Sequence, residues 1–67
     1  MSQEITPTHR LILAYAYVDQ SREGLVRATD NVYRAGNPDV YPAAVQLREM
    51  ADTLVGIETL LRQVAGL

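Results

Sequence analysis

The 67-residue sequence contains no cysteine and only one histidine, His9. Without cysteine no disulfide framework can form, and a single imidazole supplies too few ligands for a structural zinc site. Nothing therefore points to an oxidising compartment, and we expect a cytoplasmic protein. Short chains that have neither disulfides nor a metal usually obtain the missing stability by associating with another chain.

Long hydrophobic runs are also missing. The longest uninterrupted apolar run, residues 11–18, has eight residues, whereas a membrane-spanning helix needs about 20. The run has no basic stretch before it and no small-residue cleavage site after it, so it does not resemble a secretory signal. We therefore expect no membrane span.

Motifs for catalysis are absent as well. The glycines stand singly rather than in a phosphate-binding loop, and no serine or threonine has a candidate base at motif spacing. The acidic residues contain no Glu-x-x-His motif. Instead, most of the charged residues pair at helical spacings of three or four, which is typical of solvated faces: Asp19–Arg22, Glu23–Arg27, Asp30–Arg34, Arg48–Asp52 and Glu58–Arg62. We expect no enzymatic activity, no cofactor and no metal.

What the sequence does contain is a pair of apolar stripes with alternating spacings of three and four. Such spacing, sustained over several heptads, predicts helices that pack along a shared seam. The sequence therefore predicts an all-α fold, an antiparallel two-helix hairpin in which these stripes meet. The first stripe is Leu11, Ala14, Val18, Ser21, Leu25, Ala28, Val32 and Ala35, and the second is Val40, Ala43, Leu47, Met50, Leu54, Ile57, Leu61 and Val64.

Capping signals set the expected helix bounds. Thr6 and Pro7 predict the start of a first helix that extends to about residue 35, where Gly36 and the following Asn-Pro end it. The second helix starts between Pro38 and Pro42, giving helices of about 7–35 and 42–65. Residues 1–5 are expected to form a frayed lead to a single domain, 6–67, and a bend at Gly24 is left open. A β-strand over residues 11–18 also fits the local alternation, but no second strand pattern exists to pair with it.

A surplus of apolar residues remains outside the predicted seam, mostly at the open end of the hairpin. Side chains that the hairpin cannot cover must be covered by another surface. We therefore predict a protein interface made of Ile12, Leu13, Tyr15, Tyr17, Val55, Leu60 and Leu67.

These features predict a non-enzymatic protein–protein interaction module. The leading hypothesis is a small helical-hairpin assembly or regulatory protein, which acts as a homodimeric four-helix bundle and contacts a larger protein. A second hypothesis is an accessory subunit of a heteromeric complex that docks through Leu11–Val18. A third, a small dimeric RNA- or DNA-binding regulator, is opposed by the formal net charge of −2, because phosphate contacts need a positive surplus.

Replacing Leu13 and Tyr17 together with glutamate is expected to dissociate the oligomer. Both side chains lie outside the seam and inside the predicted interface, so the variant would bury unpaired charges there. Light scattering measures the mass of the variant and of the unmodified chain. An unchanged mass would place the interface elsewhere.

Overall fold

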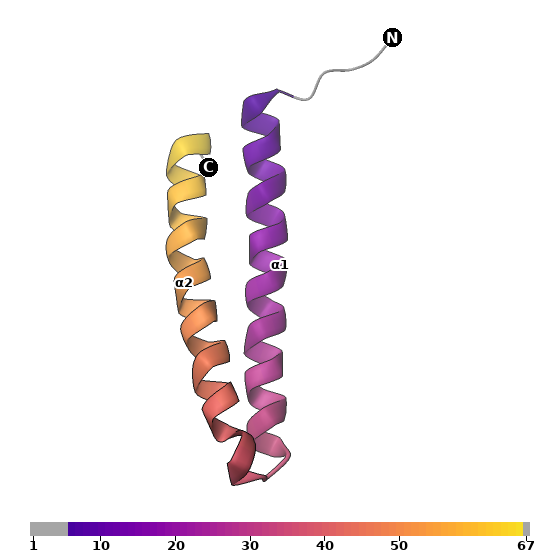
Figure 1. Ribbon diagram of the computed structural model, residues 1–67. Coiled ribbons are helices and arrows are strands. Elements are labelled where there is room, and N and C mark those ends of the chain that lie inside the picture. The colour runs from indigo at the N-terminus through magenta and orange to yellow at the C-terminus, as the bar shows by residue number, and fades with distance from the viewer. Residues whose placement is uncertain (1–5, 67) are drawn as a thin grey trace.

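The computed structural model describes residues 6–66, which form two long helices packed side by side in an antiparallel hairpin (Figure 1). Helix α1 spans Pro7–Arg34, a single 3-10 turn spans Pro38–Val40, and helix α2 spans Tyr41–Ala65. No strand occurs in residues 6–66. The predicted all-α hairpin is confirmed, while the lead over residues 1–5 lies outside the described residues.

The helix ends follow the capping signals of the sequence. The Thr6 hydroxyl oxygen accepts a hydrogen bond from the His9 backbone N–H at 3.1 Å, and Pro7 occupies the first turn. At the other end, Gly36 adopts a φ of +70°, which a residue with a side chain rarely tolerates. Helix α1 continues through Gly24 and runs nearly straight in Figure 1.

The connection between the helices is short, and the side chain of Asn37 stabilises its turn. The Asn37 side-chain oxygen accepts a hydrogen bond from the Asp39 backbone N–H at 3.0 Å, and Pro38 begins the 3-10 turn. Helix α2 therefore starts at Tyr41, between the two prolines as predicted, and ends at Ala65, followed by Gly66 with a φ of +74°.

The seam is made largely by the residues that the first stripe predicts. Ser21 and Ala35 are exceptions: both are exposed, and Arg22 takes the place next to α2 that Ser21 was expected to fill. The half-buried members of the predicted stripe on α1 are Leu11, Ala14, Val18, Leu25, Ala28 and Val32.

The second stripe is only half right. Leu47, Leu54 and Leu61 are half-buried as expected. Helix α2 is, however, rotated about its own axis relative to the predicted orientation. The buried row beside these leucines is Ala44, Ala51 and Glu58 instead of Ala43, Met50 and Ile57, and Val40 and Val64 are also exposed. Alanines allow a closer approach of the two backbones than Met or Ile would, and the Glu58 carboxylate pairs with Arg22 of α1.

The hairpin has almost no hydrophobic core. The buried apolar residues are Ala44 and Ala51, with 0% and 6% of their surface exposed, and no large side chain of residues 6–66 is fully buried. A domain normally has two packed layers around its core, whereas this molecule is a single layer, 13 Å deep in its thinnest dimension. Large apolar side chains therefore remain at the surface.

Leu54→Ala is expected to lower the free energy of unfolding of the single hairpin by about 1 to 2 kcal/mol. Leu54 is half-buried, so the loss falls below the about 2–5 kcal/mol of a fully buried leucine. Val45→Ala, on a half-exposed residue of the same helix, is the control and should change stability little. Urea unfolding followed by circular dichroism measures both, and equal effects would remove Leu54 from the seam.

Candidate protein-interaction surface

One charged cluster crosses the seam between α1 and α2. Arg22 Nε donates a hydrogen bond to Glu58 Oε1 at 2.8 Å, and Arg22 Nη2 donates one to Asp19 Oδ1 at 3.0 Å. The hydrogen bond to Glu58, and then that to Asp19, raises the pKa of Arg22 above its ordinary value. The guanidinium stays charged and compensates Glu58, which is only 8% exposed.

Glu58 corrects a prediction from the sequence, which placed it on a solvated face in a pair with Arg62. It is buried because it lies in the row next to Leu54 and Leu61, where α2 meets α1. The Asp19–Arg22 and Asp30–Arg34 pairs are confirmed, at 3.0 and 2.8 Å. The sequence contained a signal for Glu58: an antiparallel hairpin that turns near residue 38 brings it to about the level of Arg22.

The side of the hairpin that carries this cluster also holds an open groove of about 340 Å³. Near the turn, the rings of Tyr33 and Tyr41 lie 5.3 Å apart. We call this side of the hairpin the charged face. It is formed by both helices and carries Asp19, Arg22 and Glu58 together with the groove. Its groove is lined by Val26, Thr29, Asp30, Tyr33, Arg48, Ala51 and Asp52.

The opposite broad side has a different composition. On each helix a further set of residues borders the leucines and valines of the seam. Its members follow one another at spacings of three and four, so they share one side of the helix, the side away from Arg22 and Glu58. We call this surface the uncharged face, because none of the residues that compose it carries a charge; Arg10 continues the same row of α1, one turn before Ala14. It consists of Ala14, Tyr17, Ser21, Gly24, Ala28 and Asn31 of α1, with Ala43, Gln46, Met50, Thr53, Ile57, Leu60 and Val64 of α2.

The two helices contribute different shapes to the uncharged face. Helix α2 contributes an apolar row, Met50, Ile57, Leu60 and Val64, whose exposed fractions run from 40% at Ile57 to 66% at Val64. Helix α1 contributes a small row, Ala14, Ser21, Gly24 and Ala28. A Cβ added at Gly24 would meet open space. The face therefore presents large apolar side chains on α2 beside mostly small residues on α1, where Tyr17, 67% exposed, is the large exception.

Most polar side chains of the uncharged face are already hydrogen-bonded within their own helix. The Ser21 hydroxyl donates to the Tyr17 carbonyl at 2.9 Å, and the Thr53 hydroxyl donates to the Glu49 carbonyl at 3.0 Å. Asn31 Nδ2 donates to the Arg27 carbonyl at 2.8 Å. The Ser21 and Thr53 hydroxyls already have acceptors, and Asn31 has one for one of its two amide N–H groups, so covering the face leaves these donors paired.

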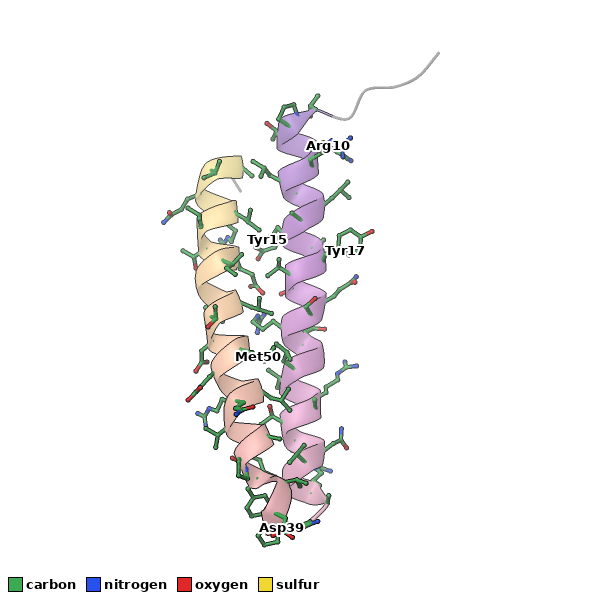
Figure 2. All side chains as sticks on the ribbon, in the orientation of Figure 1. Arg10, Tyr15, Tyr17, Asp39 and Met50 are labelled. Carbon is green, nitrogen blue, oxygen red and sulfur yellow. The ribbon has the colours of Figure 1, made fainter. Side chains whose placement is uncertain are left out.

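The predicted interface residues do not gather on one surface. Tyr17 and Leu60 belong to the uncharged face, whereas Tyr15 is half-buried and lies on the other side of the seam. Figure 2 shows Tyr15 directed towards α2 and Tyr17 directed away from it. Ile12 and Val55 are exposed on the charged-face side, and Leu13 is exposed on α1 one turn before Tyr17.

Leu67 lies outside the described residues. The sequence reasoning missed Met50, Ile57 and Val64 as surface residues because it assigned them to the seam. The same stripe contained a signal. Its leucines, Leu47, Leu54 and Leu61, form one row at a spacing of seven, and of the residues in the stripe only this row faces α1.

The structure offers little support for other kinds of site. No group of acidic, histidine or cysteine residues in the described range is placed to hold a metal ion. Within residues 6–66, neither helix is apolar enough over a sufficient length to cross a membrane. Comparison with models of known protein families, with curated proteins and with solved structures found no match to this chain.

Glu58→Leu is expected to lower the melting temperature, because it leaves Arg22 beside the seam without its main partner. The double variant Arg22→Leu/Glu58→Leu should recover most of the loss, since two apolar side chains can pack where the ion pair was. Asp30→Ala, which removes an exposed pair, is the matched control and should have little effect. Thermal unfolding followed by circular dichroism measures all three, and a double variant less stable than Glu58→Leu would contradict this account.

Proposed function

We propose that this chain is a non-enzymatic protein–protein interaction module that forms a homodimeric four-helix bundle through its uncharged face. The observation that carries the proposal is a hairpin of one layer, with no large buried side chain in residues 6–66, whose broad face lacks charge. In a dimer the charged faces remain outside. We propose that they contact a larger protein, so that the dimer acts as a small assembly or regulatory unit.

Covering the uncharged face gains free energy at little electrostatic cost. Each half-exposed side chain of the apolar row contributes on the order of 1 kcal/mol when it is covered. No ion has to leave water, so the desolvation penalty that opposes many interfaces is absent. The polar side chains Ser21, Asn31 and Thr53 keep their internal hydrogen bonds.

The size of the face also suits a stable dimer. The 25 residues of α2 give a paired length of about 37 Å, and two helices side by side are about 20 Å wide. The projected area of about 750 Å² compares with the about 800 Å² that each partner contributes to a standard interface.

The alternatives have less support. Docking through Leu11–Val18 alone would use a segment whose inward residues, Leu11 and Val18, are already half-buried in the seam. Binding of nucleic acid needs a positive surplus, whereas the formal net charge is −2, and Arg22 and Arg34 are paired with carboxylates.

The test is the solution mass of the purified chain over a hundredfold concentration range, with helicity measured on the same samples. We expect a helical dimer whose melting temperature rises with concentration, because dissociation accompanies unfolding. Ile57→Glu places a charge on the uncharged face and should shift the mass towards that of a monomer. Val55→Glu is the matched control, since Val55 is similarly exposed on the other side, at 48% against 40%.

A helical monomer at every concentration would overturn the homodimer. A chain that folds only when another protein is present would favour the accessory-subunit hypothesis. A dimer dissociated by Val55→Glu but not by Ile57→Glu would move the interface to the charged face.

A further inference from the structure

We propose that the two copies are related by a two-fold axis parallel to the helices, so that the apolar row of each copy rests on the small row of the other. This inference depends on the proposed homodimer and specifies its partner surface. In this arrangement α2 of one copy packs against α1 of the second copy, and the two turns lie at the same end.

The register within one hairpin fixes the levels of the two rows. Arg22 lies beside Glu58, and Tyr33 lies beside Tyr41. The two contacts differ in register by six residues, because long side chains reach along the helices. Since both helices rise by the same amount per residue, the register midway between the two contacts places the following residues level to within about one position. Met50 is about level with Ala28, Ile57 with Ser21, and Val64 with Ala14.

A two-fold axis parallel to the helices keeps every residue at its own level and exchanges the two sides of the face. Three of the four large side chains of the apolar row then meet a small residue of the second copy: Met50 meets Ala28, Ile57 meets Ser21, and Val64 meets Ala14. Alternation of large and small residues across facing positions fills a core at native density. At the edge of the face, Tyr17 lies level with Leu60 of the second copy.

The other two-fold arrangement, with the axis perpendicular to the helices, matches the rows poorly. It places α1 against α1 and α2 against α2, so that large side chains face large ones and small residues face small ones. The helices would have to splay on one side and close on the other. Close packing of both pairs at once favours the parallel axis.

Gly24 fits this arrangement. It interrupts α1 at a cost of about 1 kcal/mol against alanine, and nothing in its own chain lies within 4 Å of a Cβ built there. In the proposed dimer it lies level with Thr53 of the second copy, where the missing side chain lets the helices approach. Gly56, which also faces open space, lies on the outer side of α2 and does not enter the interface.

The two glycines provide a matched pair of variants. Gly24→Leu is expected to raise the dimer dissociation constant by about tenfold or more, because the added side chain collides with the second copy. Gly56→Leu should leave the constant nearly unchanged, and both variants should keep their helicity. Equal effects of the two variants would overturn the proposed packing.

Cross-linking tests the arrangement directly, since the sequence has no cysteine of its own. A chain with Ala28→Cys is mixed with an affinity-tagged chain with Met50→Cys, and the mixture is oxidised. A disulfide requires Cα atoms within about 7 Å, so we expect the mixed product. The control mixture, Ala28→Cys with Val45→Cys on the outer side of α2, should give none.

The outcomes separate this inference from the proposed function. If the chain is a dimer but the mixed product fails to form, and Ser21→Cys instead links to itself, the axis is perpendicular and only the inference falls. If no dimer forms, the inference and the proposed function fall together.

Discussion

Two helices in contact can cover only one side of each other, and every other property of this protein depends on that geometric limit. Here the shared line is narrow, because it is built on Ala44 and Ala51 of α2. The alanines bring the backbones close together and leave the bulkier Met50 and Ile57 on the outside. The feature that makes the hairpin tight therefore also keeps it from enclosing its own large side chains.

Polar side chains find their partners in different ways on the two broad faces. On one face, Arg22, Asp19 and Glu58 form a cluster in which opposite charges compensate each other. On the other, Ser21 and Thr53 donate to carbonyl oxygens of their own helices. The first arrangement fixes how α1 and α2 lie against each other, and the second removes the polar obstacle to covering the surface. Register within the hairpin and association in the proposed dimer thus depend on separate sets of residues.

The sequence predicted the helices and their ends closely, because caps and turns depend on neighbouring residues such as Thr6, Pro7 and Gly36. It predicted the rotation of α2 poorly. A stripe with spacings of three and four contains two adjacent rows, and the row that faces α1 depends on contacts between distant residues. The pair of Arg22 and Glu58, separated by 36 positions, is such a contact. For the same reason the sequence placed Tyr17 and Leu60 at the surface, where both are exposed, but assigned Met50, Ile57 and Val64 to the seam.

The short turn has a consequence for the evolution of such a chain. It places Pro7 and Ala65 towards the same end of the molecule, as Figure 1 shows. In a dimer whose turns also lie together, the end of one copy is near the beginning of the other. Duplication of the gene in tandem would then need only a few linking residues to encode all four helices in one polypeptide. Each half would afterwards be free to diverge, so that the two charged faces would no longer have to be identical.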